Sequence, residues 1–532
     1  MSSVSLTIDG HAVQIAPGGT VLAAARVLGI DIPTLCYLEK CGPLNSCQVC
    51  LVKINGRLVP ACGTPAQAGM VIESETDEVH EARRTALELL FSEHVGDCLS
   101  PCQRLCPLGM NIPVMIRQLQ AGDRPAAAAT VRAALPLAGV LGRLCHHPCE
   151  QGCRRGTADE PASIREMERF AADWEPTPPA ATTGEEAAAP PAPGARRVVI
   201  VGAGPAGLAA AWHLNRAGYA CTVADRHPTP GGSLRAEVES GNLPGTVLEA
   251  EIALLRRAGV VFQPGLELGD DLTLDGLLLG FDAVLVTVGE MSKAEGEALG
   301  LAMAPGGVRV EADTYVTSRR AVFAAGRAVR PMTQVLRAVG EGRAAAEIVH
   351  QFLTDQDLKR PGKPFSSIMG RLDKAEIQTF LGTASPAPAQ SPCDVCSGFN
   401  QGEAAAAAAR CLRCDCRSSG QCALQSYAED YGADASRYRQ QRRPFEQFSQ
   451  PGGVIFEPGK CILCGICVKL TELAGEPLGL AFVGRGFDVR VAAPFDRAVQ
   501  DGLKGVAEEC VRHCPTGALA FHHGIKPPPP PA

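Results

Sequence analysis

The chain has 532 residues, of which 46% are hydrophobic and 20% are charged, and its formal net charge is −7. This length predicts several domains, and the acidic balance argues against nucleic acid or an anionic membrane surface as the main partner. Residues 1–4 lack the basic and apolar regions of a signal peptide, and no run of about eighteen apolar residues marks a membrane span. We therefore expect a cytoplasmic protein, in which thiols stay reduced and grouped cysteines indicate metal sites.

The first stretch of the chain predicts a small sheet domain that holds a metal centre. Residues 4–16 alternate in polarity around Asp9-Gly10, which predicts a β-hairpin, and Thr20 is placed to cap an Ala-rich helix. Four cysteines come next, at the spacing Cys-x10-Cys-x2-Cys-x11-Cys. This spacing suits a [2Fe–2S] centre in a β-grasp ferredoxin domain. The alternative is a zinc site, but zinc is commonly bound by paired Cys-x2-Cys knuckles. The four cysteines are Cys36, Cys47, Cys50 and Cys62, and Cys41 is a spare thiol.

This cysteine region also resembles a known family. The stretch IPTLCYLEKCGPLNSCQVCLVKINGRLVPAC is similar to the N-terminal domain of the large peripheral-arm subunit of respiratory complex I. It is similar as well to the matching domain of NAD-linked formate dehydrogenases and hydrogenases. The resemblance implies a [2Fe–2S] domain in an electron-transfer protein.

A second cysteine-rich region follows within residues 80–172, which are predicted to be mostly helical. The segments HVGDCLSPCQRLCPLGMNIP, GRLCHHPCEQGC and PASIREMERF resemble the N-terminal iron–sulfur domain of the glutamate synthase small subunit and of dihydropyrimidine dehydrogenase. That resemblance implies two [4Fe–4S] clusters, each with three thiolates. One would take Cys98, Cys102 and Cys153, and the other would take Cys106, Cys145 and Cys149.

Six thiolates leave each of these two clusters one ligand short. His94 is the candidate for the first, because a His-x3-Cys start also occurs in the complex I relative. Glu168 is the candidate for the second, because it falls where the family places a non-thiolate ligand. The alternatives are that His94 is a surface residue, that Glu168 lies on a solvated helix face, and that one cluster is lost or contains fewer irons.

The middle of the chain predicts a dinucleotide-binding unit. An apolar strand at 198–201 leads into a glycine-rich turn and an Ala-rich helix, and a second strand, 220–224, ends at Asp225. The glycines allow a tight turn close to a pyrophosphate at the helix N-terminus, and the acid reaches a ribose hydroxyl. The turn consists of Gly202, Ala203, Gly204, Pro205, Ala206 and Gly207.

The later motifs of this unit resemble the FAD domain of glutamate synthase small subunits. They are Gly231-Gly232, FDAVLVTVG ending at Gly289, and VFAAG ending at Gly326. The family inserts an NAD(P)H domain after VTVG, but here only about seventeen residues separate Gly289 from the next strand, fewer than the roughly thirty of a βαβ unit. Arg327 stands where the family has an acid. The resemblance therefore implies FAD bound at Gly232, Gly289, Gly326 and Arg327, without the familial NAD(P)H site.

Two cysteine groups complete the chain. CILCGIC followed by CPTGAL predicts a [4Fe–4S] site that also resembles the complex I large-subunit pattern, with Cys510 as the spare thiol. Its ligands are Cys461, Cys464, Cys467 and Cys514. An upstream group, Cys411, Cys414, Cys416 and Cys422, predicts another [4Fe–4S] cluster. The alternatives for that segment are a zinc ribbon from Cys393, Cys396, Cys411 and Cys414, or partly free thiols.

The fold class expected is multidomain, α+β and α/β. The domains are a [2Fe–2S] β-grasp domain (1–79), a helical [4Fe–4S] domain (80–175), a linker (176–196), a Rossmann-like FAD domain (197–355), a second linker (356–392), a Cys-rich metal-binding segment (393–450), a [4Fe–4S] ferredoxin-like domain (451–525) and a disordered tail (526–532).

These domains predict an FAD- and iron–sulfur-containing electron-transfer subunit of a multisubunit oxidoreductase. It would carry one FAD, one [2Fe–2S] and three to four [4Fe–4S] centres, with zinc as an option for one of them. By resemblance, its partners would be a molybdenum or tungsten formate dehydrogenase, a hydrogenase or an NADH-oxidising flavoprotein, with ferredoxin and electron bifurcation as further options. A self-sufficient NAD(P)H-dependent reductase and a non-redox assembly subunit stay open. No acid–base or nucleophile constellation assigns a catalytic residue beyond the redox groups.

Overall fold

The computed structural model describes residues 3–174, 194–360, 362–439, 442–449 and 453–521. The chain folds as two compact units. The first comprises residues 1–100, 364–383 and 413–532, and the second comprises residues 101–363 and 384–412.

These units divide the chain differently from the predicted domains. Residues 80–100, expected in the helical domain, belong to the first unit. The predicted Cys-rich segment 393–450 is split, because a boundary between the two units falls between Leu412 and Arg413. The predicted linker 176–196 lies almost entirely outside the described residues, and the predicted tail 526–532 lies entirely outside them.

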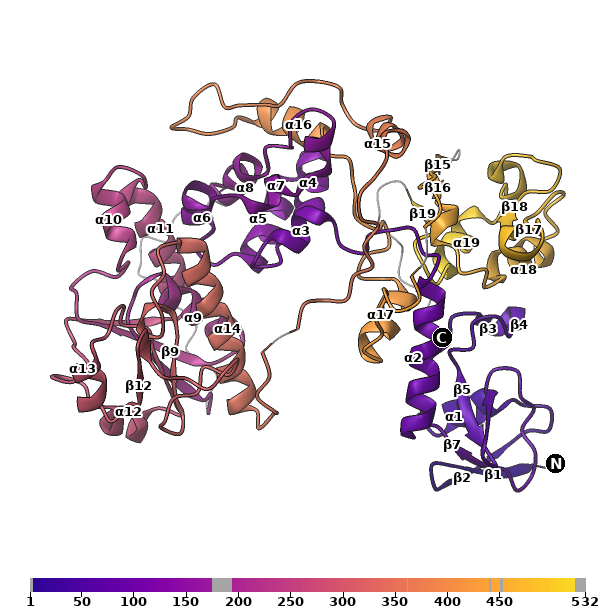
Figure 1. Ribbon diagram of the computed structural model, residues 1–532, viewed down its shortest axis with the longest axis horizontal. Helices are drawn as coiled ribbons and strands as arrows, with labels where there is room; N and C mark the ends of the chain where they lie inside the picture. Colours follow the sequence, from indigo (N-terminus) through magenta and orange to yellow (C-terminus); the bar gives the residue numbers. More distant parts are fainter. Residues whose placement is uncertain (1–2, 175–193, 361, 440–441, 450–452, 522–532) are drawn as a thin grey trace, which may run out of the picture. The chain divides into compact units, whose positions relative to one another are not determined.

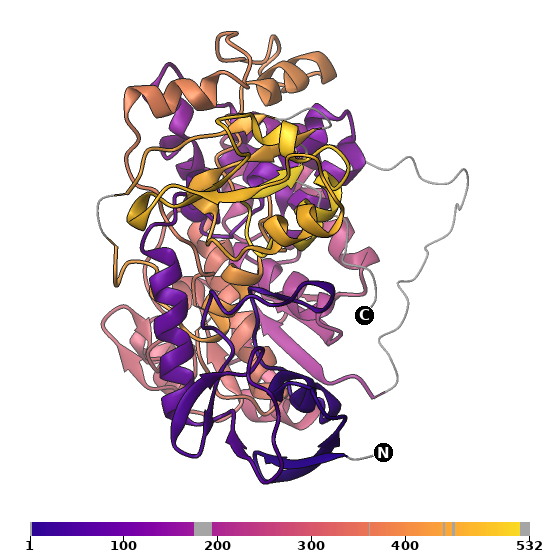
Figure 2. The ribbon, with the colours of Figure 1, turned by 90° about the vertical axis from the view of Figure 1, so that its right-hand side faces the viewer.

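The first unit begins with a mixed five-stranded sheet in the order β2-β1-β7-β5-β6. The predicted hairpin is confirmed: β1 pairs antiparallel with β2, and Asp9 and Gly10 turn with positive φ angles of 48° and 82°. Thr20 caps α1 by accepting a hydrogen bond from the Ala23 N–H, and α1 buries its apolar face against the sheet (Figure 2). The elements are β1 Val4–Ile8, β2 His11–Ile15, α1 Val21–Val27, β3 Tyr37–Leu38, β4 Gly42–Pro43, β5 Leu51–Ile54, β6 Arg57–Pro60 and β7 Val71–Glu73.

The long helix α2, Asp77–Phe91, ties this sheet to the C-terminal part of the same unit. Its buried Arg83 donates hydrogen bonds to the Leu51 carbonyl oxygen at 2.9 Å and to the Tyr431 hydroxyl at 2.7 Å. A shared core then joins residues near Cys36 with α17 and α18. The remaining elements are α15 Lys374–Leu381, α17 Ala423–Asp430, β15 Phe448–Ser449, β16 Val454–Phe456, α18 Ile466–Leu473, β17 Ala481–Val483, β18 Arg490–Ala492, α19 Ala507–His513 and β19 Leu519–Phe521.

Helix α15 corrects the expectation of a plain linker over 356–392. Asp373 and Glu376 form a reciprocal capping box at its N-terminus, and Ile377 and Phe380 are buried. The Phe380 ring stacks on Phe445 at a centroid distance of 4.4 Å. A short capped helix with a buried apolar face is stable only through such packing, which the linker-like composition hides.

The second unit contains a helical part whose core is continuous with that of the nucleotide-binding part. In the described residues no single helix is long and apolar enough to cross a membrane. Two consecutive helices, α5 and α6, reach the required length and apolar composition only when they are counted together, and the chain bends by 85° between them. The helices are α3 Pro101–Leu105, α4 Ile112–Gln120, α5 Arg124–Ala134, α6 Ala138–Leu144, α7 Pro148–Gln151, α8 Ile164–Ala172 and α16 Gln401–Ala409.

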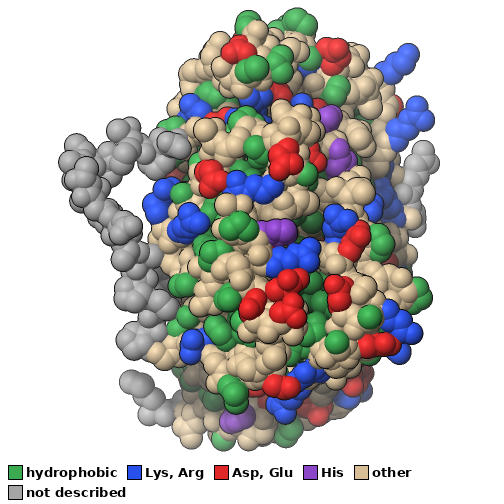
Figure 3. Space-filling model, turned by 90° about the vertical axis from the view of Figure 1, so that its left-hand side faces the viewer, with side chains coloured by type: hydrophobic (Ala, Val, Ile, Leu, Met, Phe, Trp, Pro, Cys, Tyr) green, Lys and Arg blue, Asp and Glu red, His purple; other side chains and the backbone are tan. Residues whose placement is uncertain are grey.

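The nucleotide-binding part is a parallel five-stranded sheet in the order β10-β9-β8-β11-β14. Helix α14 packs along α9 beside this sheet (Figure 1). On the face drawn in Figure 3, Lys and Arg side chains are interspersed with Asp and Glu. The elements are β8 Arg197–Val201, α9 Pro205–Arg216, β9 Ala220–Asp225, α10 Leu234–Glu239, α11 Gly245–Arg257, β10 Val261–Pro264, α12 Leu274–Gly280, β11 Ala283–Val286, α13 Lys293–Ala298, β12 Met303–Ala304, β13 Gly307–Val308, β14 Val322–Ala324 and α14 Val335–Leu353.

Between β11 and β14 the chain forms only α13 and the two-residue strands β12 and β13. Residues 287–321 therefore hold no second Rossmann unit, as their length predicts.

Candidate cluster and dinucleotide sites

The four N-terminal thiols come together in the structure. Cys36, Cys47, Cys50 and Cys62 are all buried. Hydrogen bonds from the Cys47 and Cys62 thiols lower the pKa of Cys36, and Cys62 also pairs with Cys50 and lowers its pKa to about 7. The four thiols are linked pairwise by hydrogen bonds, Cys47 to Cys36, Cys36 to Cys62 and Cys62 to Cys50, and they form a donor set that fits a [2Fe–2S] centre.

The C-terminal thiols line one small cavity. Cys461, Cys464, Cys467 and Cys514 surround it, together with apolar side chains such as Ile466. Burial, with the charge of the Cys514 thiolate, raises the pKa of Cys461 to about 12. Such thiols ionise only with a cation beside them, and the set fits a [4Fe–4S] cluster. The spare Cys510 is buried in α19, with its sulfur 3.9 Å from the Cys467 carbonyl oxygen.

These two thiol groups are neighbours within the first unit. The Ser46 hydroxyl donates a hydrogen bond to the Cys464 carbonyl oxygen at 3.3 Å. Burial raises the pKa of Cys464, and the Cys514 and Cys36 thiolates contribute to that rise. The N-terminal and C-terminal sites therefore lie next to each other.

A third thiol group of the first unit contains Cys98, Cys416 and Cys422. Burial raises the pKa of each of the three, and the Cys98 thiolate contributes to the rise at both Cys416 and Cys422. The Cys422 sulfur lies 3.6 Å from the carbonyl oxygen of Pro515, which follows Cys514. This grouping differs from the family-based expectation, which placed Cys98 with Cys102 and Cys153. Cys98 belongs to the first unit, whereas Cys102 and Cys153 belong to the second.

In the second unit, Cys106, Cys145 and Cys149 gather around Glu168. Burial followed by the Glu168 carboxylate raises the pKa of Cys145 to about 11, and the Cys149 pKa is raised by the same two causes. Glu168 is only 6% exposed, so the alternative of a solvated helix face is wrong. Burial raises the pKa of Glu168 to about 8, and its Oε1 has no hydrogen-bond partner. Three thiols and a buried, unpartnered carboxylate fit a [4Fe–4S] cluster, as predicted.

Cys153 and Cys411 also lie near each other in the second unit. The Arg155 guanidinium donates to the Arg410 carbonyl oxygen at 3.0 Å, and its pKa is raised by Asp159 first and by the Cys153 and Cys411 thiolates to a smaller extent. Cys102 lies close enough to Cys149 for its charge to contribute to the raised pKa of that thiol. Cys153 and Cys411 are candidate ligands of one further cluster.

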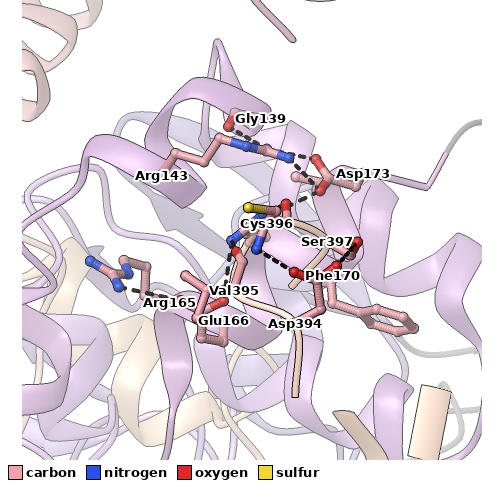
Figure 4. A network of polar contacts seen from close by, with 12 residues as sticks. Gly139, Arg143, Arg165, Glu166, Phe170, Asp173, Asp394, Val395, Cys396 and Ser397 are labelled. Atoms are coloured by element: carbon pink, nitrogen blue, oxygen red, sulfur yellow. Dashed lines mark hydrogen bonds and ion pairs between the residues drawn. The ribbon is translucent and has the colours of Figure 1, made fainter. Parts of the chain in front are cut away.

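The remaining pair, Cys393 and Cys396, is exposed. Arg169 of α8 holds the turn between them by donating to the carbonyl oxygens of Val395 and Cys396, the two acceptor residues labelled in Figure 4. No group of three or more His, Cys, Asp or Glu side chains in the described part of the chain is arranged for a single metal ion. In a [4Fe–4S] cluster each thiolate binds a different iron, and in a [2Fe–2S] centre two thiolates bind each iron, so the ligands of neither cluster all converge on one metal ion.

The dinucleotide site is a cavity of about 460 Å³ at the carboxyl ends of β8, β9 and β11. This position is the switch point of the strand order, where open parallel sheets bind ligands. The cavity is lined by most of the predicted residues: Gly202, Gly204, Pro205, Ala206, Asp225, Gly232, Gly289 and Arg327. The other three predicted residues, Ala203, Gly207 and Gly326, do not line the cavity but lie in or beside the turns that form it.

Two features fix the phosphate-facing turn. A Cβ at Gly207 would lie 1.9 Å from the Gly202 carbonyl oxygen, so only glycine allows α9 to start this close to β8. The Asp225 carboxylate accepts hydrogen bonds from the Ala203 N–H at 2.6 Å and from the His227 N–H at 2.7 Å. Each of its oxygens keeps a lone pair for a ribose hydroxyl. Arg327, the residue that replaces the family acid, forms an ion pair with Glu290 at the cavity rim.

Lys460 is a candidate functional residue that the sequence analysis missed. Its side chain is 4% exposed, and its Nζ donates to the Glu457 carboxylate at 2.5 Å. Burial opposes its charge, but the Cys416 thiolate and Glu457 raise the pKa of Lys460. A lysine directly before a Cys-x2-Cys motif is the signal that could have found it.

Comparison with known proteins supports this picture domain by domain. Residues 1–77 match the family model of a 2Fe-2S iron-sulfur cluster binding domain, and residues 74–178 match that of dihydropyrimidine dehydrogenase domain II, 4Fe-4S cluster. Residues 200–259 match an NAD(P)-binding Rossmann-like domain.

Among curated proteins, the chain is 38% identical over 208 residues to the NADP(+)-dependent formate dehydrogenase subunit beta of Moorella thermoacetica, covering 36% of this chain and 29% of that one. It is 36% identical over 207 residues to the NAD-dependent dihydropyrimidine dehydrogenase subunit PreT of Escherichia coli, covering 38% and 49%. It is 47% identical over 106 residues to the NADP-reducing hydrogenase subunit HndD of Solidesulfovibrio fructosivorans, covering 19% and 18%.

The chain thus spans less than half the length of each of these relatives. The matches confirm the predicted resemblance to electron-transfer subunits of oxidoreductases, with iron–sulfur domains before a Rossmann-like domain.

Proposed function

We propose that the chain is an FAD- and iron–sulfur-containing electron-transfer subunit of a cytoplasmic multisubunit oxidoreductase. The observation that carries the proposal is the adjacency of thiol groups in the first unit. The Cys36 group neighbours the Cys464 group through Ser46, and Cys514 neighbours Cys422 through Pro515. Each cluster carries one electron at a time, and neighbouring clusters in such a row can pass electrons from one to the next.

FAD is the proposed occupant of the 460 Å³ cavity of the second unit. Flavins couple two-electron to one-electron chemistry, which iron–sulfur clusters alone do not do. The backbone N–H groups at the start of α9 face the pyrophosphate position, and Asp225 is held in place for a ribose by two backbone N–H groups. The ion pair with Glu290 partly neutralises Arg327. Arg327 would therefore orient the cofactor rather than give the rim of the cavity a positive charge.

The expected partners are other subunits of the same oxidoreductase. Residues 287–321 offer no separate nicotinamide domain, so electrons would enter from, or leave to, a partner that handles the substrate. By resemblance, that partner is a molybdenum or tungsten formate dehydrogenase, a hydrogenase or an NADH-oxidising flavoprotein, and ferredoxin is a further acceptor.

A second occupant of the cavity has its own support. The match of residues 200–259 to an NAD(P)-binding domain favours a nicotinamide nucleotide in the same site. In that case the chain would be a self-sufficient reductase.

The test is metal and flavin analysis of the full chain, purified without oxygen. The proposal expects one FAD, about 18 irons from one two-iron and four four-iron centres, and matching acid-labile sulfide. NADH and NADPH should leave its visible spectrum unchanged. Rapid bleaching by either nucleotide would establish the reductase instead, and zinc with little iron would establish a structural role for the metal sites.

A further inference from the structure

Two cysteines of the second unit differ from all the others in their access to solvent. All 23 cysteines lie in the described residues, and only Cys393 and Cys396 are exposed. Both are free thiols, and two residues separate them. Reaction with a disulfide needs an accessible thiol with a second thiol close by, and an exposed Cys-x2-Cys pair supplies both.

The turn that carries this pair is held from within and from α8. The Asp394 carboxylate accepts a hydrogen bond from the Cys396 N–H at 2.9 Å, and the Asp394 carbonyl oxygen accepts one from the Gly398 N–H at 2.9 Å. Arg169, whose side chain is only 9% exposed, donates to the Val395 carbonyl oxygen at 2.9 Å and to that of Cys396. A buried arginine thus anchors an exposed turn, so the thiols keep a defined place at the surface.

The Cys393 thiol has a carboxylate beside it. Glu403 of α16 accepts a hydrogen bond from this thiol, which raises the pKa of Cys393, and another from the Cys393 N–H at 3.0 Å. The carboxylate also accepts from the Asn400 N–H at 2.9 Å in the capping box of α16, so its position is fixed. Glu403 can therefore take the proton when the Cys393 sulfur acts as a nucleophile.

We propose that Cys393 and Cys396 are a redox-active dithiol that reduces disulfides by thiol–disulfide exchange. The Cys396 thiolate attacks one sulfur of the substrate disulfide and releases the other, which takes up the proton that Cys396 has lost. The Cys393 sulfur then gives its proton to Glu403 and attacks the Cys396 sulfur. This step forms the Cys393–Cys396 disulfide and releases the second substrate sulfur, which takes the proton from Glu403. Two electrons and two protons pass from the pair to the substrate.

The substrate class is an accessible disulfide, in a small molecule or on a protein. Two intervening residues let a turn bring the two Cα atoms within about 7 Å, close to the range of a disulfide bond. A second dithiol returns the pair to its reduced form by the reverse exchange. In a cytoplasmic protein such bonds are usually transient and serve catalysis or redox sensing. The exchange goes beyond the proposed function, since it uses neither the flavin nor an iron–sulfur cluster.

The pair is tested on the full chain, purified without oxygen and treated separately with oxidised glutathione and oxidised protein disulfide isomerase. After acid quenching and alkylation, trypsin releases residues 375–410 as one peptide that contains these two cysteines and no other. The peptide should lose two hydrogen atoms as the pair closes, and an equal amount of probe should be reduced. Closure by glutathione indicates a small-molecule substrate, and closure by the isomerase alone indicates a protein disulfide.

Three variants test the roles of the individual residues. Cys393→Ser should stop at a mixed disulfide on Cys396, because no second thiol resolves it, whereas Cys396→Ser should not close. Glu403→Gln keeps a residue that a capping box accepts, and it should slow the resolving step roughly tenfold because the base is lost. Cys41→Ser, at a half-buried spare thiol, is the control and should close at the unsubstituted rate.

A peptide that keeps both thiols with both probes overturns the proposal, and so does a zinc ion that is lost in Cys393→Ser. Equal rates of closure in Glu403→Gln and in the unsubstituted chain would refute the role of Glu403. Iron, FAD and the electron paramagnetic resonance (EPR) signals of the clusters should be unchanged in Cys393→Ser and Cys396→Ser. A loss of iron in either variant would assign the pair to a cluster and overturn the exchange. Failure of the exchange and failure of the electron-transfer function are therefore separate results.

Discussion

Ser46 donates its hydroxyl hydrogen bond to the Cys464 carbonyl oxygen at 3.3 Å, and this bond joins the loops of two candidate cluster sites. Ser46 directly precedes Cys47, a thiol of the N-terminal group, while Cys464 belongs to the C-terminal group. Ser46 itself is exposed, but Cys36, Cys47 and Cys464 belong to one buried core. Two redox centres whose ligands share one buried core are suited to direct electron exchange.

The first prediction concerns magnetic interaction between these two centres. When both are reduced, their spins should broaden each other's EPR signal and shorten its relaxation. Cys467→Ser should remove the C-terminal cluster and narrow the N-terminal [2Fe–2S] signal. Cys510→Ser is the matched control in the same region, because Cys510 lies outside the cavity that the four ligands line. A [2Fe–2S] signal with identical relaxation in both variants would contradict the adjacency.

The second prediction concerns the dinucleotide turn. Gly207→Ala would place a Cβ 1.9 Å from the Gly202 carbonyl oxygen, a backbone atom that cannot give way without moving β8 from α9. We expect loss of bound flavin with retention of the first unit's clusters. Gly280→Ala is the control, since a Cβ there meets no atom within 4 Å. The measurement is FAD per chain together with the [2Fe–2S] absorption. Full FAD occupancy in Gly207→Ala would show that the turn does not hold the cofactor.

The local features of both units could be predicted from the sequence. The strand that ends at Asp225 and the hairpin around Asp9-Gly10 depend on neighbouring residues, and the structure forms both as predicted. The convergence of Cys106, Cys145, Cys149 and Glu168 also agrees with the family pattern, because all four lie within one helical part. Groupings of residues within one domain can therefore be predicted from the spacing of those residues along the sequence.

Long-range groupings could not be predicted in the same way. Cys98 lies close to Cys102 in sequence, yet it is placed with Cys416 and Cys422 because the chain changes units between Ser100 and Pro101. Lys460 was missed for a related reason, since only tertiary packing brings its charge to Cys416. Helix α15 was missed because its capping box stands in a proline- and glycine-rich stretch.

The third prediction concerns Glu168. Its Oε1 is buried beside three thiols and has no partner, which is costly unless a cation binds there. Glu168→Ala should therefore lose about four irons, whereas Glu168→Cys should retain them with an all-thiolate site. Glu166→Gln is the control on the same helix, because Glu166 forms ion pairs with Arg165 and Arg169. Equal iron in Glu168→Ala and in the unsubstituted chain would show that the carboxylate is not a ligand.

The fourth prediction concerns Glu376, which is 3% exposed and paired with Arg442. The Arg442 guanidinium donates to its Oε2 at 2.7 Å, and this pairing lowers the pKa of Glu376 to about 2. Because the folded pKa lies below the unfolded one, the pair stabilises the fold above a pH of about 4.5, and that contribution is lost as the pH falls toward 2. Arg442→Met should destabilise the first unit by about 3 kcal/mol at neutral pH, because it leaves a buried carboxylate unpaired.

The sign of the pH dependence identifies this mechanism. Without Arg442, burial raises the pKa of Glu376, so the folded variant takes up a proton more readily than the unfolded chain. The deficit in the midpoint of thermal unfolding should therefore shrink between about pH 7.5 and pH 5. Arg443→Met removes an ion pair to Glu93 in which both side chains are largely exposed, and it should cost about 1 kcal/mol or less at every pH. A deficit in Arg442→Met that stays the same from pH 7.5 to pH 5 would mean that lost packing, rather than the unpaired carboxylate, causes the destabilisation.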